Sequence, residues 1–269
     1  MNFDKQYYNI GFLDQLSYKE TFVHKLDPRA KIITTSLFFF TVISFSKYEV
    51  ASLLPFFLYP VLLMTIGEIP FMLIFRKVIL VSPFAVFIGI FNPLLDSGQV
   101  FIFQGLAISV GWLSFFSILI RFTLTVSTTL LLIATTSFPG VCHGLRQLGL
   151  PSLFVSQLSF LYRYIFVLME ETMRIVRARN MRSYGERGKD MRILVRIAGM
   201  LFIRTVERAE RIYSAMLSRG FQGDMPSLKP YRIKMADVVF TVSILTFLYV
   251  FRLYPVTRIL GGFIQGVFS

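Results

Sequence analysis

The sequence has few of the residues that build disulfides or metal sites. Its 269 residues include one cysteine, Cys142, and two histidines, His24 and His143. One cysteine cannot form a disulfide within the chain, and two histidines do not supply a metal site of the usual three or four ligands. Charged residues are also scarce, at 16% of the chain against about a quarter in soluble domains. These shortages exclude a disulfide scaffold and argue against a soluble domain and a resident metal centre.

Apolar and aromatic side chains are abundant instead. Hydrophobic residues make up 55% of the chain, which includes 30 Phe and 12 Tyr, and the mean hydropathy is +0.64. So much apolar surface excludes a disordered chain. The first 31 residues are mixed and charged, so we expect no cleavable signal peptide. The composition predicts an all-α, polytopic membrane helix bundle.

Long runs without charge mark the expected membrane-spanning helices. A span needs about 20 mainly apolar residues to cross a hydrocarbon core of about 30 Å. Several runs here are shorter, so they must recruit flanking residues or thin the bilayer. About five spans are predicted, from the uncharged runs 32–46, 50–67, 78–95 and 238–251 and from the segment 97–145, in which Arg121 is the only formally charged residue.

The segment 97–145 is long enough for two spans. Two helices would need a turn near Arg121, where the sequence IRFTLTVS contains no Gly, Pro or Asn. We therefore expect one long, tilted helix over about 106–137, preceded by a short re-entrant or surface piece. Arg121 is then expected to snorkel or to join a buried polar pair. A competing count splits the segment and adds a span over 151–169, which leaves the orientation of the chain unchanged.

Positive charge is concentrated in one part of the chain. The net charge is +13, and residues 138–235 carry 17 of the 28 Lys and Arg but 7 of the 15 Asp and Glu. Because Lys and Arg stay on the cytoplasmic side, this part and the N-terminus are predicted to be cytoplasmic. Cys142 and His143 then lie where the fourth span reaches the cytoplasm. The expected division is 1–137 with four spans, 138–234 in the cytoplasm, and 235–269 with the last span and the tail.

Two long basic helices are predicted within the cytoplasmic part. Apolar residues recur at intervals of three and four over 154–182 and again over 190–219. Each helix ends in an arginine followed by a small residue, in Met181-Arg182-Ser183 and in Ser218-Arg219-Gly220. Ordinary C-capping explains such an end, because Arg suits the negative helix terminus and Gly suits the left-handed cap. Matched ends would also serve bivalent docking, since a guanidinium fits a carboxylate-lined pocket.

Three motifs of the chain occur in this order in one known family. Residues 26–31 read Leu-Asp-Pro-Arg-Ala-Lys, and residues 162–179 contain Tyr-Arg-Tyr, Glu-Glu and Ala-Arg. Residues 207–223 begin with Glu-Arg-Ala-Glu-Arg and end with Ser-Arg-Gly-Phe-Gln-Gly. With Thr135-Thr136 and Gly149-Leu150-Pro151, they resemble CbiQ-type proteins, the transmembrane (T) components of energy-coupling factor transporters for cobalt or nickel. The resemblance covers essentially the whole chain.

The resemblance implies where the chain meets its partners. In the family, two signatures of Ala-Arg-Gly type end two crossing coupling helices, and each inserts its arginine into a groove of one ATPase subunit. Both signatures depart from that pattern here, and the first keeps only its arginine, with Ala178-Arg179-Asn180 as an alternative register. Asp27 before Pro28 predicts a helix N-cap that needs no partner. The expected site residues are Arg179, Arg182, Ser183, Ser218, Arg219 and Gly220 for ATPase docking, Met216 and Phe221 beside them, and Asp27, Pro28 and Arg29 for the structural N-terminal motif.

The resemblance also implies a division of labour. Two ATP-binding cassette ATPases hydrolyse ATP, a membrane subunit of the CbiM type binds the metal ion, and this chain connects them; a small accessory membrane subunit is a further candidate partner. The residues agree, because the chain has no G-x-x-x-x-G-K-[ST] phosphate loop and no Cys, His and carboxylate cluster for cobalt or nickel. We expect a non-catalytic subunit of the cell (inner) membrane with no cofactor of its own.

Other classes of function are retained as alternatives. A T component of a vitamin transporter fits the same motifs, and a scaffold that binds anionic membrane lipid fits the basic helices. A membrane-embedded enzyme would need facing acidic or His residues inside the spans, whereas Glu49, Glu68, Asp96 and Asp237 lie at span ends. No nucleic-acid partner is expected, because the other faces of the basic helices are needed for packing.

Overall fold

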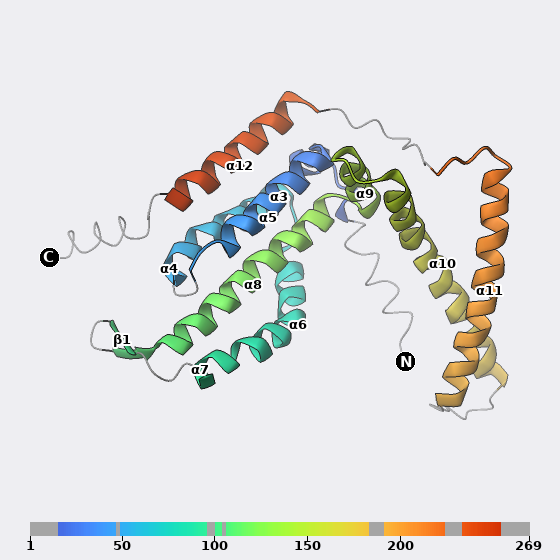
Figure 1. Ribbon diagram of the computed structural model, residues 1–269, viewed down its shortest axis with the longest axis horizontal. Helices are drawn as coiled ribbons and strands as arrows, with labels where there is room; N and C mark the ends of the chain where they lie inside the picture. The colour runs from blue at the N-terminus through green and yellow to red at the C-terminus, as the bar shows by residue number, and fades with distance from the viewer. Residues whose placement is uncertain are drawn as a thin grey trace. The chain divides into compact units, whose positions relative to one another are not determined.

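The computed structural model describes residues 16–46, 49–95, 100–103, 106–182, 191–223 and 233–253. Apart from one short hairpin these residues are helical or in turns, which confirms the predicted all-α class. They fall into two compact units, which we describe separately. The membrane unit contains residues 16–137 and 233–253, and the helix-pair unit contains residues 138–223 (Figure 1).

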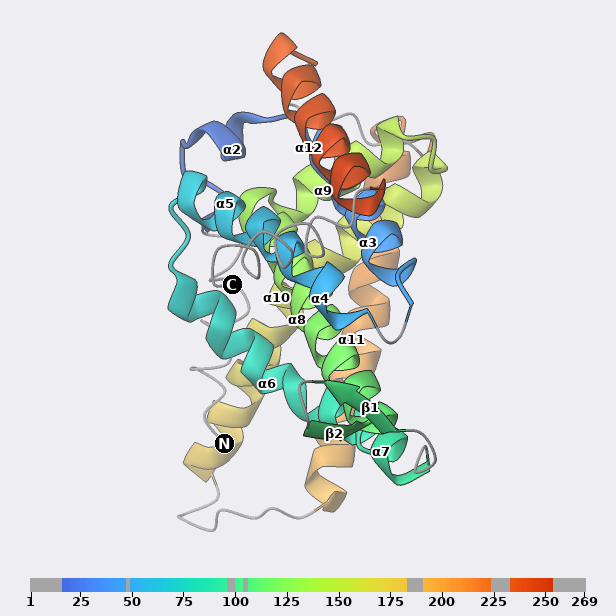
Figure 2. The same cartoon turned by 90° about the vertical axis from the view of Figure 1, so that its left-hand side faces the viewer.

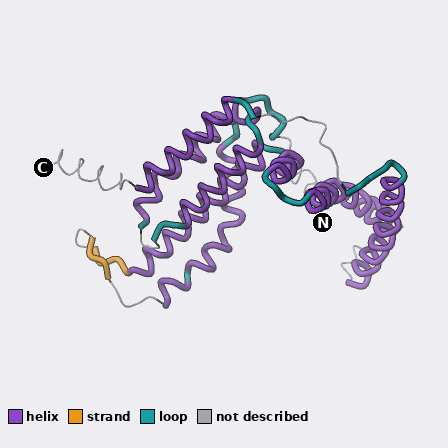
Figure 3. The backbone as a smooth tube through the Cα atoms, turned by 45° about the horizontal axis from the view of Figure 1, so that its top comes forward, coloured by secondary structure: helices purple, strands orange, loops and turns teal. Residues whose placement is uncertain are grey.

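The membrane unit contains a helix at each of the five predicted spans. Its central helix, α8, packs against α3, α5 and α6, and α3 lies between α8 and α12 (Figure 1). Figure 3 shows these helices as nearly parallel tubes. The elements are α2 (Phe22–Lys25), α3 (Pro28–Ile43), α4 (Val50–Leu53), η1 (Leu54–Phe57), α5 (Leu58–Ile66), α6 (Phe71–Gly89), α7 (Phe91–Leu95), β1 (Val100–Phe103), β2 (Leu106–Ser109), α8 (Val110–Thr135) and α12 (Met235–Leu253).

The fourth span differs from its prediction at both ends. α8 runs without a break through Arg121, as expected, but it begins at Val110 and not near residue 106. Residues 106–109 form β2, which pairs antiparallel with β1 beside α7 (Figure 2). The Val, Phe and Ile residues of β1 suit a strand, and the residues at 106–109 that suggested helix pair with it as the second strand of a hairpin. α8 ends at Thr135, and Cys142 and His143 lie on the separate helix α9 (Phe138–Gln147) rather than at the end of the span.

Among the residues that the structure describes, four helices are long and apolar enough to cross a membrane, which agrees with a multi-pass membrane protein. They are Phe71–Pro93, Gly111–Thr135, Ser152–Arg179 and Met235–Leu253, and Val50–Ile66 is a shorter apolar helix. The first predicted span, α3, has 16 residues, so it is among the spans that need flanking residues or a thinner bilayer. Ser152–Arg179 overlaps the extra span of the competing count, and its composition permits that count as well.

Aromatic side chains from separate elements form the core of the membrane unit. Phe38 on α3 is fully buried, stacks on Tyr59 of α5 at 4.7 Å between ring centroids, and meets the edge of Phe56 at 6.1 Å. Phe56 also contacts Phe45 and Phe247, at 5.3 and 6.1 Å. Offset and edge-on ring pairs of this kind add about 1 kcal/mol each beyond their buried area. They hold α5 and α12 against α3.

The helix-pair unit contains α9, α10 (Ser152–Arg182) and α11 (Met191–Leu217), and both predicted basic helices are confirmed. α9 ends at Gln147, Gly149 after it has a left-handed φ of 102°, and the amide of Leu150 donates to the carbonyl of Leu145 at 3.2 Å. This cap turns the chain from α9 into α10. The rings of Phe138 and Tyr162 stack at 4.5 Å and hold α9 against α10.

Candidate functional site

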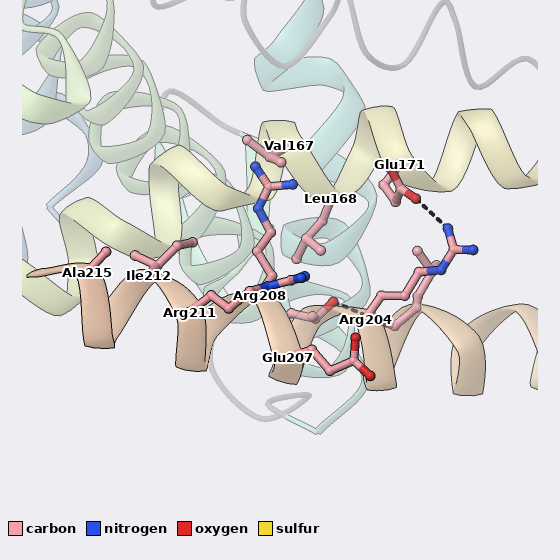
Figure 4. Close-up of a pocket in the computed structure, with 11 residues that line it drawn as sticks. Val167, Leu168, Glu171, Arg204, Glu207, Arg208, Arg211, Ile212 and Ala215 are labelled. Carbon is pink, nitrogen blue, oxygen red and sulfur yellow. Dashed lines mark hydrogen bonds and ion pairs between the residues drawn. The ribbon is translucent and has the colours of Figure 1, made fainter.

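α10 and α11 pack as an antiparallel pair. The guanidinium of Arg204 on α11 donates to the carboxylate of Glu171 on α10 at 2.7 Å, near the middle of the pair (Figure 4). At one end, residues 174–182 of α10 face residues 196–204 of α11. At the other end, the Ser156 hydroxyl donates to the carbonyl of Gly223 at 3.4 Å. The C-terminal ends of the two helices therefore lie at opposite ends of the pair.

The first predicted docking residue lies at one of these ends. Arg182 is the last residue of α10 and is exposed, and Met181 beside it is 81% exposed. Arg179 is half-buried and lines a groove together with Arg182 and with Arg196 of α11. Ser183 lies outside the described residues. The structure therefore brings Arg182 and Arg179, the two candidate registers of the first signature, into one groove.

The second predicted docking residue lies at the other end, on a capped helix terminus. Gly220 has a φ of 79°, its amide donates to the carbonyl of Leu217 at 3.0 Å, and the amide of Phe221 donates to the carbonyl of Met216 at 3.1 Å. This hydrogen-bond pattern confirms the predicted left-handed glycine cap. Ser218, Arg219 and Gly220 are exposed. The cap orders the backbone that carries the Arg219 side chain.

The seam between the two helices is hollowed in three places that share lining residues, and the lining changes character along it. Its apolar section, of about 490 Å³, is lined by Leu153, Phe160, Leu161, Tyr164, Met216 and Phe221 among others. Its middle section, of about 590 Å³, contains the Glu171–Arg204 ion pair, Glu207, Arg208 and Arg211 (Figure 4). Its basic section, of about 560 Å³, is lined by five arginines and a single acid, namely Arg174, Arg179, Arg182, Arg196, Arg204 and Glu171.

Met216 and Phe221 lie in the apolar section of this groove and face α10. Both are half-buried, so they are not on the outermost surface beside Arg219. The sequence predicted that these two residues lie at the end of α11, but it did not predict which element their side chains face. Apolar residues at helical spacing mark a buried face of a helix without identifying the neighbour that packs on it.

The N-terminal motif caps α3 as predicted. Pro28 is the first helical residue, and the Asp27 carboxylate accepts a hydrogen bond from the amide of Arg29 at 2.9 Å. The capping bond is local, and the backbone amide of Asp27 makes a second, long-range contact. The amide of Asp27 donates to the carboxylate of Asp237 at 2.7 Å, and both residues are 3% exposed. The motif therefore joins the N-terminal ends of α3 and α12, which are far apart in the sequence.

Two residues of this junction were missed as contacts by the sequence reasoning. Asp237 also accepts from the amide of Lys234 at 2.6 Å, three residues before it, as the third-position acid of a capping box does. Lys31 is buried, and its ammonium donates to the carbonyl of Thr135 at the end of α8 at 2.9 Å. The carboxylates of Asp237 and Asp27 compensate its charge. The spacing of four between Asp27 and Lys31 was the available signal, because it places both on one helix face.

The opposite end of α3 is held by two arginines. Arg121 of α8 donates to the carbonyls of Phe45 and Ser46 at 3.0 and 2.6 Å. Arg252 of α12 donates to the carbonyl of Ser44 at 3.2 Å and lies 4.4 Å from the centroid of the Phe45 ring. Cations stabilise the carbonyls that end a helix. The polar partner of Arg121 is therefore the backbone at the end of α3.

The described residues provide no site for catalysis on a metal. Within them, no group of three or more His, Cys, Asp or Glu side chains is placed to hold a metal ion. Cys142 is buried, and burial raises the pKa of its thiol, which disfavours the nucleophilic thiolate.

Comparison with known proteins identifies relatives over most of the chain. The model of a family described as cobalt transport protein, CbiQ, matches residues 19–231. The energy-coupling factor transporter transmembrane protein EcfT of Bacillus subtilis is 30% identical over 216 residues, which are 75% of this chain and 81% of that protein. The cobalt transport protein CbiQ of Salmonella typhimurium is 30% identical over 99 residues, 36% of this chain and 44% of that one. A protein named as a fused cobalt transport protein, CbiMQ, from Methanocorpusculum labreanum is 36% identical over 92 residues, 34% of this chain and 15% of that one.

Proposed function

Because the chain belongs to the CbiQ family of cobalt transport proteins, we propose that it is the transmembrane coupling subunit of an ATP-driven importer for cobalt or nickel ions. In this role it binds neither ATP nor the metal ion and performs no catalysis. Two ATP-binding cassette ATPases supply the energy, and a substrate-binding membrane subunit of the CbiM type carries the metal. A small accessory membrane subunit completes the list of partners, and the relative named as a fused CbiMQ supports the CbiM-type partner.

The position of the two helix ends is the observation that supports this proposal. Arg182 lines the same section of the groove as Arg196, and Arg219 ends the same helix 23 residues after Arg196. At 1.5 Å per residue the two arginines are separated by roughly 35 Å along the pair. One small partner cannot cover both ends, whereas two partner subunits can each take one. Each guanidinium would enter a carboxylate-lined pocket of its own ATPase.

The proposed mechanism is mechanical coupling. The α10–α11 pair lies in the cytoplasm in this scheme, in the inner-membrane orientation that positive charge favours. When the ATPases close on ATP, the docked ends move, and the Glu171–Arg204 ion pair makes the two helices move together. The movement passes to the membrane helices through the chain segments that connect the units. Such coupling requires an element with two arrangements that ligand binding biases.

Charge reversal at the two ends tests the proposal. We expect Arg182→Glu and Arg219→Glu each to remove one of the two ATPase copies from the purified complex, and the double variant to remove both. Arg163→Glu, an exposed arginine of α10 that does not line the groove, is the matched control and should retain two copies. The readout is the ATPase-to-coupling-subunit ratio in the membrane-extracted complex. Two full copies on the double variant would refute docking through these ends.

A second candidate is a T component for a different substrate, such as a vitamin. It is kept because the match to EcfT, whose name specifies no substrate, covers 75% of this chain, whereas the match to the Salmonella cobalt transport protein covers 36%. Isolation of the native complex distinguishes the two. A CbiM-type companion supports metal import, and a different substrate-binding membrane subunit supports the alternative.

A further inference from the structure

The groove between α10 and α11 is open, and its three sections share lining residues. Val167, Leu168 and Arg208 line both the apolar and the middle section. Glu171 and Arg204 line both the middle and the basic section. A ligand in the apolar section can therefore contact apolar side chains and the Arg208 guanidinium at the same time, because Arg208 also lines that section.

The apolar section presents surface that a membrane protein does not leave to water. Leu153 is 69% exposed and Leu161 is 61% exposed, and both line the groove. Only 11% of the most apolar window of Ser152–Arg179 is buried inside the structure. Contiguous apolar surface of this kind marks an interaction site for lipid or protein. The ligand of this section has to be apolar.

The adjoining sections carry more positive than negative charge. Glu171 is the single acid of the basic section, and its carboxylate already binds Arg204 at 2.7 Å and lies 3.7 Å from Arg174. Within the part of the chain that the structure describes, Arg196 and Arg208 form no ion pair. Guanidinium groups bind phosphate through paired hydrogen bonds. The ligand of these sections has to be anionic.

We propose that this groove binds an anionic phospholipid, with its phosphate at Arg208 and the neighbouring arginines and its acyl chains in the apolar section. The charge complementarity selects this ligand. A neutral lipid would leave the arginines uncompensated, and inorganic phosphate or a nucleotide would leave the apolar section exposed. Basic pockets between helices of membrane proteins bind acidic headgroups in the same way. The bound lipid contacts both helices, so it fills the space that would otherwise separate them.

This inference goes beyond the proposed function, because it assigns a lipid ligand to the groove, which Met216, Phe221, Arg179 and Arg182 of the docking ends also line. Arg208 contacts neither end of the pair, whereas Arg182 is shared by the basic section and the docking end and is therefore unsuitable as a test residue. Arg208→Gln removes the charge and keeps hydrogen-bonding capacity, and Arg208→Lys keeps the charge. Arg163→Gln makes the same charge change outside the groove.

Native mass spectrometry of the full detergent-extracted chain with added lipid tests the proposal. The probes are phosphatidylglycerol, phosphatidylcholine of the same chain length, and inorganic phosphate. We expect the wild-type chain to retain phosphatidylglycerol at least tenfold better than phosphatidylcholine. Arg208→Gln should lose about tenfold in phosphatidylglycerol affinity, because a charge-assisted hydrogen bond is lost. Arg208→Lys should recover part of this loss, and Arg163→Gln should show none.

Three results would overturn the proposal. Equal retention of the two lipids would show an apolar surface without headgroup recognition. An equal loss in Arg163→Gln and Arg208→Gln would show general attraction to a basic protein. Displacement of the lipid by millimolar phosphate would show a free-anion site. Circular dichroism establishes that the variants keep their helices, and if Arg208→Gln unfolds, the comparison of Arg208→Lys with the wild type decides. Unchanged ATPase recovery with Arg208→Gln keeps this result separate from the docking test.

Discussion

Replacement of Asp237 probes the junction of α3, α8 and α12 most directly. The carboxylate accepts two backbone hydrogen bonds, from Asp27 at 2.7 Å and from Lys234 at 2.6 Å, and it helps to compensate the buried ammonium of Lys31. Asp237→Ala removes all three interactions. Asp237→Asn keeps an acceptor for the amide of Asp27 and removes the charge. The two variants therefore separate hydrogen bonding from charge compensation.

The burial of these groups sets the expected magnitude. The amide of Asp27 is buried, and a buried donor without a partner costs about 1–3 kcal/mol. Loss of the partly buried bond from Lys234 adds about 1 kcal/mol. We expect Asp237→Ala to lower the free energy of unfolding by about 3 kcal/mol, and Asp237→Asn by about half as much. At about 2–4 °C per kcal/mol for a chain of this size, Asp237→Ala should lower Tm by about 6–12 °C.

The assay is thermal unfolding of the detergent-extracted chain, followed by circular dichroism. Glu20→Ala is the control, because the Glu20 side chain is 88% exposed and its ion pair with Lys25 should contribute little. Lys31→Met tests charge compensation, since it removes the ammonium that compensates the buried carboxylates of Asp27 and Asp237. The double variant Lys31→Met/Asp237→Asn should lose about 2 kcal/mol less than the sum of the single losses. A Tm for Asp237→Ala close to that of Glu20→Ala, or simple additivity in the double variant, would refute the reasoning.

Three further predictions concern single positions. Gly220→Ala should lower the free energy of unfolding by about 1 kcal/mol, because the backbone at this position is left-handed, although no atom lies within 4 Å of the added Cβ. Gly220→Asn should lower it by less. Tm and ATPase recovery are measured for both variants. Burial, followed by the charge of Lys31, lowers the pKa of His24 below its ordinary value of 6.5. The neutral His24 therefore contributes to stability above pH 6.5, and this contribution is lost as the pH falls below 6.5. Tm should fall more steeply between about pH 7.5 and 5.5 in the wild type than in His24→Gln. In sealed vesicles, Arg219→Cys should react with a membrane-impermeant thiol reagent only from the cytoplasmic side and Leu253→Cys only from the opposite side, and the reverse pattern would contradict the predicted topology.

The features that the sequence predicted correctly are those that depend on neighbouring residues. Asp27 and Pro28 give the start of α3, because a cap and its first turn lie within three residues. Gly220 gives the end of α11 for the same local reason. The continuity of α8 through Arg121 followed from the lack of a turn signal. Local conformational preference was sufficient for each of these elements.

The features that were missed depend on partners that are distant in the sequence. Asp237 contacts a residue 210 positions before it, and the spacing of neither motif contains that information. The strand β2 was taken for helix because its apolar residues suit both, and only its pairing with β1 decides between them. The positions of Met216 and Phe221 likewise depend on α10, which covers them.

The distribution of polar contacts suits the two units to different tasks. In the membrane unit, polar side chains bind α3 at both ends: Asp237 and Lys31 at its start, and Arg121 and Arg252 at its end. Its aromatic core fixes the middle, so these helices cannot shift without breaking buried hydrogen bonds, and a unit of this kind moves as one body. The α10–α11 pair has an exposed ion pair near its middle and an open groove on either side of it. Bending of this pair breaks few buried contacts, so an ATPase acting on its ends would bend the pair before it moved the membrane unit. A lipid that filled the groove would make the pair stiffer, and more of the movement would then reach the membrane unit.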